Sequence, residues 1–213
     1  MTFYPYKSLN ISDIIFDLGG VVLDIDYRLT LQAFAQLGVQ NLEEIYTLTA
    51  QREVVSQFER GQIDARTFIE ELQPLLRIDL DYDKAVAAWN AMILPWSPQR
   101  MTLVERLRNH YGLHLLSNTN TLHRDVFEFT LRQTTGQCMA HYFDHVGYSF
   151  EMGARKPEPE IFRAMLRWAK LDPSRTLFID DNASNVEAAR AEGIMAYHIN
   201  PSHERIDDLF VEE

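Results

Sequence analysis

Short apolar runs that alternate with helical stretches place the strongest limit on how this chain can fold. Four such runs predict buried strands, because each is short and ends at a turn or a polar group. They span residues 12–18, 113–118, 176–180 and 194–199. A weaker strand is expected in the stretch FDHVGYS. Strands that alternate with helices predict a parallel sheet covered by helices on both faces.

Helical periodicity fills the chain between the later runs. It predicts helices at residues 99–110, 122–133, 159–170 and 184–192. We expect a capping box of Ser184 and Glu187 to begin the last of these, and Gly193 to follow its end. The predicted fold class is therefore α/β, with a three-layer Rossmann-like core built on a parallel sheet.

A block from about residue 27 to residue 93 has a different pattern, because it shows helical periodicity and no convincing strand. One helix is expected to end at Gly38, and another to begin at the capping residue Asp64 and to break near Pro74. This pattern predicts a helical domain inserted into the α/β core. The predicted domains are a core of residues 1–26 and 95–213 and a helical insertion of residues 27–94.

The composition disfavours several classes of partner. The chain has 213 residues, a formal net charge of −11 and one cysteine, Cys138, which can form no internal disulfide. An acidic surface disfavours nucleic acid and anionic membranes, because phosphate groups need Lys and Arg to neutralise them. No apolar run is long enough to span a membrane, and the first ten residues lack a signal-peptide pattern. We expect a cytoplasmic protein, and the sequence leaves monomer and homodimer open.

Polar side chains stand at the carboxyl ends of three predicted strands. They are Asp17, then Ser117 with Asn118, and then Asp180 with Asp181. Because ligands bind beyond these ends in parallel sheets, we expect the side chains to converge on one edge. Adjacent carboxylates raise each other's pKa unless a cation lies nearby. The three aspartates supply hard oxygen donors, which suits Mg²⁺.

Each of these signals also has a purely structural explanation. Asp17 alone could cap the loop that follows it, and the pair at 180–181 could cap the next helix. In the stretch GARKPEPEIF, Arg155 and Lys156 precede a Glu-rich helix start. They could form a solvated charge cluster, or Lys156 could balance a phosphate and the carboxylates. Only the combination of these groups favours a catalytic site.

The order and spacing of these motifs resemble the haloacid dehalogenase-like (HAD) hydrolase family over nearly the whole chain. The resemblance rests on FDLGGVVLD, LLSN, GARKPEPEIF and FIDDNASN. The helical block resembles the family's inserted cap. Within the family, FERGQIDARTF and LLSNTN are most similar to the branch that holds α-D-glucose-1-phosphate phosphatase.

The resemblance implies a Mg²⁺-dependent phosphatase that acts on a small phosphorylated metabolite such as a sugar phosphate. It implies that Asp17 is the nucleophile, that Lys156 neutralises charge, and that Ser117 and the Asn118 N–H hold the phosphoryl oxygens. The implied metal ligands are Asp17, the carbonyl of Gly19, Asp181 and, through water, Asp180. The role of Asn185, at a position that is often acidic, is left open.

Gly19 departs from the family pattern, because most phosphatases of the family have a second Asp two residues after the nucleophile. That Asp protonates the leaving oxygen and then activates water, which is typically worth about 10²–10⁴ in rate. Three explanations remain open. The substrate has a good leaving group; another group substitutes, such as Asp24, Asp26 or a cap residue; or the protein is a catalytically weak phosphate-binding module.

Rival functions are a 2-haloacid dehalogenase, a phosphotransferase and a receiver domain. The pair at 180–181 argues against the metal-free dehalogenase, and the missing acid argues against the phosphotransferase. The late position of that pair and the helical insertion do not suit a receiver. Cap residues that are chemically plausible substrate contacts, none of them singled out, are Arg28, Arg52, Arg60 and Trp89.

Overall fold

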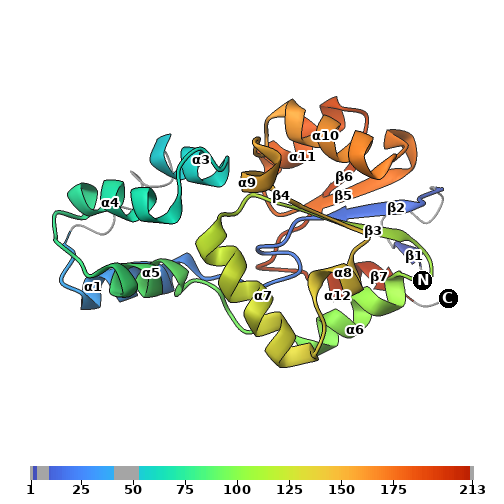
Figure 1. Ribbon diagram of the computed structural model, residues 1–213. Coiled ribbons are helices and arrows are strands. Elements are labelled where there is room, and N and C mark those ends of the chain that lie inside the picture. Colours follow the sequence, from blue (N-terminus) through green and yellow to red (C-terminus); the bar gives the residue numbers. More distant parts are fainter. Residues whose placement is uncertain (1, 4–9, 41–52, 212–213) are drawn as a thin grey trace.

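A parallel five-stranded sheet forms the centre of the computed structural model, which describes residues 2–3, 10–40 and 53–211 (Figure 1). The strand order is β4-β3-β2-β5-β6, and every pair is parallel. The strands are β2 (Asp13–Phe16), β3 (Gly112–Ser117), β4 (His145–Tyr148), β5 (Thr176–Asp180) and β6 (Met195–His198). The five predicted strands are thereby confirmed, including the weak one.

Helices cover both faces of this sheet, which confirms the three-layer α/β class (Figure 1). One face carries α6 (Pro98–Leu107), α7 (Thr121–Thr135), α8 (Met139–Tyr142) and α12 (Ile206–Leu209). The other carries α10 (Pro159–Ala169) and α11 (Ala183–Ala191), with the short α9 (Ser149–Met152) before them. The structure also has a 3₁₀ turn, Pro173–Arg175, and two short strands that pair antiparallel, β1 (Thr2–Phe3) and β7 (Phe210–Val211).

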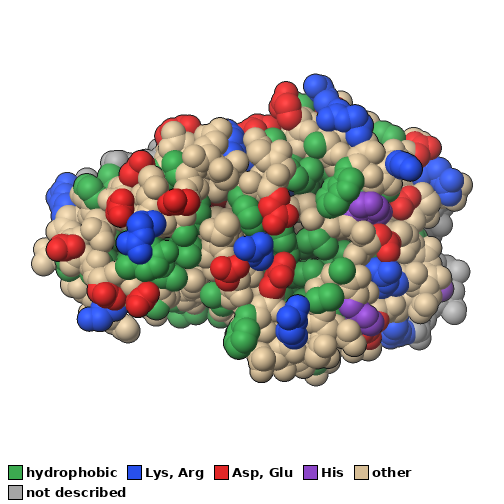
Figure 2. All heavy atoms as spheres, in the orientation of Figure 1, with side chains coloured by type: hydrophobic (Ala, Val, Ile, Leu, Met, Phe, Trp, Pro, Cys, Tyr) green, Lys and Arg blue, Asp and Glu red, His purple; other side chains and the backbone are tan. Residues whose placement is uncertain are grey.

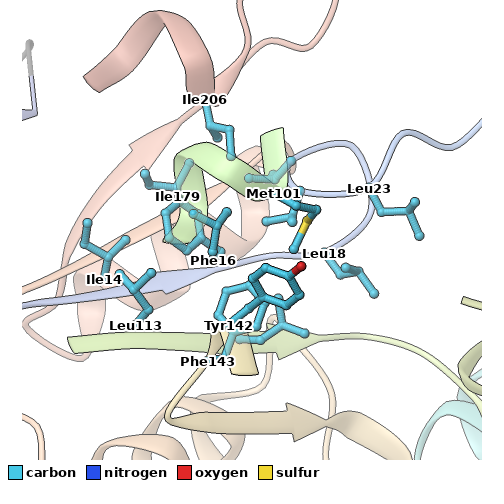
Figure 3. Packing of buried hydrophobic residues seen from close by; sticks show 14 of the residues in the cluster. Ile14, Phe16, Leu18, Leu23, Met101, Leu113, Tyr142, Phe143, Ile179 and Ile206 are labelled. Atoms are coloured by element: carbon cyan, nitrogen blue, oxygen red, sulfur yellow. The ribbon is translucent and has the colours of Figure 1, made fainter. Parts of the chain in front are cut away.

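The alternation of side chains along β2 explains why both faces are covered. Ile14 and Phe16 point into the cluster on the α6 face, whereas Ile15 points into the cluster under α10 and α11. All three side chains are fully buried. Figure 3 shows Phe16 packed with Tyr142 and Phe143 on the first of these faces. Because Ile14, Ile15 and Phe16 are apolar on both faces of the strand, the next polar residue, Asp17, lies just beyond its carboxyl end.

A separate group of helices, with its own apolar core, follows β2 in the chain (Figure 1). Phe58, Phe68 and Leu72 lie at the centre of that core. Its members are α1 (Tyr27–Gln36), α3 (Glu53–Glu59), α4 (Ala65–Leu76) and α5 (Tyr82–Asn90). The helix ends near Gly38 and Asp64 are where the sequence predicts them, since Gly38 has a φ of 95° and Asp64 accepts a hydrogen bond from the Thr67 N–H.

The predicted break at Pro74 is wrong. Helix α4 runs through Pro74 to Leu76. Pro74 removes one hydrogen bond of the last turn. Leu72 and Leu76 on either side are buried in the core of the helical group, and this packing holds the turn in place.

Two antiparallel chain segments connect the helical group to the sheet. Ile25 pairs with Ile93, the Asp26 N–H donates to the Met92 carbonyl at 2.9 Å, and the Leu94 N–H donates to the Asp24 carbonyl at 3.2 Å. The chain therefore leaves and re-enters the α/β core at one place, close to the carboxyl end of β2.

The start of α11 also differs from the prediction. Asn182, not Ser184, caps the helix, and its side chain accepts a hydrogen bond from the Ser184 N–H at 2.9 Å. The predicted capping box of Ser184 and Glu187 is therefore wrong. The Asn182 N–H donates to Asp180 at 2.8 Å, so the chain turns directly at the end of β5 and the helix begins early.

The charged side chains are interspersed on the face shown in Figure 2, with no single basic patch. This distribution agrees with the net charge of −11. In the part of the chain that the structure describes, no helix has both the length and the apolar character needed to cross a bilayer.

Candidate active site

The register of the sheet brings the predicted aspartates together. Phe16 pairs with Ile179, and the Asp17 N–H donates to the Ile179 carbonyl at 2.9 Å, so Asp17 lies beside Asp180. Asp17, Asp180 and Asp181 each place a carboxylate oxygen within 4.8 Å of the others. The predicted convergence of these three residues is confirmed.

Lys156 joins this cluster from the loop before α10. Its amine lies 2.7 Å from Asp17 Oδ1 and 2.7 Å from Asp180 Oδ2, and the residue is 1% exposed. Burial alone would lower the pKa of Lys156, but the charges of Asp17 and Asp180 outweigh burial and raise it. The lysine is therefore a buried cation and not part of a solvated charge cluster.

The cluster carries more negative charge than Lys156 can balance. Burial, and then the charges of Asp180 and Asp181, raise the pKa of Asp17 to about 7 against the opposing effect of Lys156. Burial and the charge of Asp180 also raise the pKa of Asp181. One amine faces three carboxylates, so the donor set fits a divalent cation with oxygen ligands, such as Mg²⁺.

Asn118 fixes the loop that carries Lys156. Its side chain accepts a hydrogen bond from the Lys156 N–H and donates one to the Lys156 carbonyl, both at 2.8 Å. The sequence suggests a role only for the backbone of Asn118, because the side-chain partner lies 38 residues away. The side chain thus sets the position of the lysine backbone.

Asn185 takes part in the site as a partner of Asp180. Its Nδ2 lies 3.1 Å and 3.0 Å from the two carboxylate oxygens of Asp180, and Asn185 is buried. Together with Lys156 and the Asn182 N–H, it surrounds the Asp180 carboxylate with donors. Asn185 therefore contacts the cluster of aspartates from the first turn of α11.

Ser117 ends β3 in register with Tyr148, and it is buried. The loop after it is held by Ser149, whose hydroxyl donates to the Thr119 carbonyl at 3.0 Å and accepts from the Thr119 N–H at 2.9 Å. The sequence gives no reason to single out Ser149, which is fully buried at the start of α9. This contact fixes the segment that carries Ser117 and Asn118.

The two glycines after Asp17 differ in what they require. Gly20 has a φ of 80°, and a Cβ there would lie 2.3 Å from Asp181 Oδ2. Gly19 lies outside the left-handed region, and a Cβ there would lie 3.0 Å from Cδ1 of Ile25, the end of a flexible side chain. The site therefore needs glycine at position 20 but could accommodate a side chain at position 19.

Asp24 and Asp26 are poor substitutes for the acid that is missing at Gly19. Asp24 is paired with Arg100, at 3.1 Å and 3.3 Å, and also with Arg205. Asp26 caps α1 and is bonded to Arg28, and these hydrogen bonds hold its pKa below the ordinary value. Hydrogen bonds from arginine occupy the oxygens of both carboxylates, so we assign neither of them as the proton donor.

The four residues suggested as contacts between the helical group and a substrate lie in different surroundings. Arg28 is mostly exposed and Arg60 is paired with Glu158, across the junction between the helical group and the core. Trp89 stacks on His123 of α7, with ring centroids 5.3 Å apart. Arg52 lies outside the described residues.

Comparison with known proteins identifies the class to which this fold and site belong. A family model described as haloacid dehalogenase-like hydrolase matches residues 13–193, so the chain belongs to that family. It is 30% identical over 187 residues to a D-ribitol-5-phosphate phosphatase of Bacteroides thetaiotaomicron, covering 88% of this chain and 91% of the relative. It is 28% identical over 193 residues to the sesquiterpene phosphatase AstK of Aspergillus oryzae, covering 88% and 89%.

A solved structure supports the same assignment. The HAD family enzyme BT-2542 of B. thetaiotaomicron, crystallised with magnesium and inorganic phosphate, superimposes with a TM-score of 0.86 at 31% identity. The match covers 94% of this chain and 100% of that structure. The closer resemblance to α-D-glucose-1-phosphate phosphatase stays a prediction.

Proposed function

We propose that this protein is a Mg²⁺-dependent phosphatase that hydrolyses a small sugar or polyol phosphate through an aspartyl-phosphate on Asp17. The observation that carries the proposal is the Lys156 amine, 2.7 Å from both Asp17 and Asp180. Sequence similarity indicates a phosphoric monoester hydrolase, since the chain belongs to the HAD family and two of its relatives are named phosphatases. The name of the bacterial relative, with its polyol phosphate, supports the class of ester.

In this mechanism Asp17 divides the hydrolysis into two displacements. A carboxylate oxygen of Asp17 attacks phosphorus and the ester oxygen leaves. Water then attacks the same phosphorus, and inorganic phosphate and free Asp17 are released. Lys156 holds positive charge beside the transferring group, and the Ser117 hydroxyl and the Asn118 N–H hold its oxygens.

The proposed metal ligands are Asp17, the Gly19 carbonyl and Asp181, with Asp180 acting through water. When bound, Mg²⁺ would neutralise charge on the phosphoryl oxygens and make phosphorus more electrophilic. The three carboxylates gathered within 4.8 Å support this assignment. Lys156, Asn185 and the Asn182 N–H donate to both oxygens of Asp180, whereas Lys156 occupies only one oxygen of Asp17. Asp181 and the second oxygen of Asp17 would therefore be free to hold the ion directly.

Residues 27–94 would act as the cap, and residues 1–26 and 95–213 as the core. The separate apolar cluster of the helical group supports this division, as do the two paired connecting segments. The helical group also lies over the carboxyl ends of the strands, where the cluster of aspartates is (Figure 1). A cap in this position would choose the substrate and exclude water from the phosphoenzyme.

The test is hydrolysis of p-nitrophenyl phosphate with Mg²⁺ and with EDTA, followed by a panel of sugar and polyol phosphates. We expect EDTA and Asp17→Asn each to reduce turnover to background, because one removes the cation and the other the nucleophile. Asp125→Asn is the matched control, since this exposed carboxylate of α7 is bonded to its neighbour Arg124. Turnover that survives both EDTA and Asp17→Asn would refute the proposal. Chloride release from a 2-haloacid without metal would indicate a dehalogenase instead.

A further inference from the structure

The structure limits which side chains could donate the proton that Gly19 cannot. Asp17, Asp180 and Asp181 are already used as nucleophile and metal ligands in the proposed function. Asp24 and Asp26 are held by arginines. Of the substitutes that the sequence suggests, a residue of the helical group that reaches the site is the one still open, beside a good leaving group and a catalytically weak protein.

Glu59, the last residue of α3, reaches the core beside Lys156. Its Oε2 lies 2.8 Å from Nε of Arg155, the residue immediately before Lys156, and its side chain is 16% exposed. The end of α3 contacts α9 (Figure 1). Gly61, just after α3, has a φ of 67°, and a Cβ there would lie 2.2 Å from the Phe150 carbonyl oxygen. This close approach seats Glu59 against the loop that carries the catalytic lysine.

The surroundings of Glu59 suit a group that exchanges a proton. Burial raises its pKa, although Arg155, Lys156 and Arg60 each favour the ionised form. Through its contact with Arg155, Glu59 lies against the chain segment whose next residue, Lys156, contacts Asp17. Among the described residues, neither Glu59 Oε2 nor Arg155 Nε has a hydrogen-bond partner, so their contact is an ion pair without hydrogen-bond geometry.

Resting on the proposed function, we infer that Glu59 is the general acid and base of the reaction, replacing the carboxyl group absent at Gly19. In the first displacement the Asp17 oxygen bonds to phosphorus, the phosphorus–ester oxygen bond breaks, and that oxygen takes the proton of Glu59. In the second, the Glu59 carboxylate takes a proton from water as its oxygen bonds to phosphorus. The Asp17–phosphorus bond breaks, which leaves phosphate, free Asp17 and protonated Glu59.

Glu59→Gln tests this role because the amide keeps the size of the side chain and cannot exchange the proton. p-Nitrophenolate leaves without protonation, so the variant should keep the rapid burst of about one product per enzyme. Its steady-state turnover should fall by about 10²–10⁴, because the base for the second displacement is lost. With an alkyl phosphate, the release of alcohol in a single turnover should fall in the same range.

Two further variants separate chemistry from cap docking. Glu158→Gln removes the partner of Arg60 at the same junction, and it should change the burst and the steady state alike. Gly19→Asp in the Glu59→Gln background should restore both the turnover of p-nitrophenyl phosphate and the release of alcohol from an alkyl phosphate, because position 19 accommodates a side chain.

The outcomes distinguish this inference from the proposed function itself. If the wild-type protein shows no Mg²⁺-dependent turnover, the proposed function fails. If the wild type is active but Glu59→Gln slows the burst as much as the steady state, Glu59 only docks the cap and the inference is overturned. An unchanged steady state, or no rescue by Gly19→Asp, overturns it equally.

Discussion

Gly20 is the position at which the geometry of the site depends most directly on the absence of a side chain. Gly20→Ala places a residue with a Cβ at a φ of 80°, which costs roughly 1–2 kcal/mol. The new Cβ would also lie 2.3 Å from Asp181 Oδ2, so the carboxylate must move, and overpacking of this kind typically costs about 1–3 kcal/mol. Since moving Asp181 relieves some repulsion in the cluster, we expect a loss of about 2–4 kcal/mol in the free energy of unfolding.

Gly19→Ala is the matched control, one residue away in the same loop. Its Cβ would lie 3.0 Å from the end of Ile25, which can rotate, and its backbone is outside the left-handed region. The loss should stay under about 1 kcal/mol. The two substitutions add the same methyl group, so the difference between them measures the backbone conformation and the contact with Asp181.

Urea unfolding with and without low-millimolar Mg²⁺ measures both consequences. A ligand that binds only the folded state raises its stability in proportion to the logarithm of its concentration over the dissociation constant. The Mg²⁺-dependent gain in stability should persist in Gly19→Ala and shrink in Gly20→Ala, because Asp181 is a proposed ligand. Equal losses in the two variants, or an undiminished Mg²⁺ effect in Gly20→Ala, would refute the reasoning.

Two further predictions concern Asn118, which fixes the Lys156 loop, and His123, which stacks on Trp89. Asn118→Ala leaves the Lys156 N–H and carbonyl without their 2.8 Å partners, so the free energy of unfolding should fall by about 2–4 kcal/mol. The phosphatase rate should fall as well. Urea unfolding and steady-state kinetics measure the two effects. Burial lowers the pKa of His123 from 6.5 to about 4. Between these two pH values His123 is protonated in the unfolded chain but neutral in the folded chain. The free energy of unfolding should therefore fall by up to roughly 3 kcal/mol as the pH drops from 6.5 to about 4. His123→Phe, which keeps the stacking on Trp89, should flatten this pH dependence of urea unfolding, whereas the exposed control His203→Phe should not.

The strands and the gathering of aspartates could be predicted because both depend on local pattern and one topological rule. Ile14, Ile15 and Phe16 are apolar on both faces of β2, which indicates a central parallel strand, and the polar residue that ends it must lie at the ligand-binding edge. The position of Asp17 at the end of β2 follows from the local sequence, without any contact to a residue far along the chain. The prediction therefore needs only the order of the elements.

The supporting contacts could not be predicted, because their partners are far apart in the sequence. Asp24 looks free to act as an acid until Arg100 and Arg205, 76 and 181 residues later, are brought against it. The Asn118 side chain finds the Lys156 backbone 38 residues away. Short-range errors have another origin: Asn182 caps α11 in place of Ser184 because its own N–H is drawn to Asp180.

The contrast between the two glycines bears on how the chemistry is organised. If the fold required glycine at position 19, the missing acid would be a structural necessity, but the neighbouring atom there is only the end of Ile25. The absence of a carboxyl group at position 19 is therefore a chemical property of this enzyme. With Glu59 as the proton donor, acid–base chemistry would depend on the contact between the end of α3 and the Lys156 loop, and so on how the helical group packs against the core. Such an enzyme would release a leaving group that needs protonation only from substrates over which the cap can close.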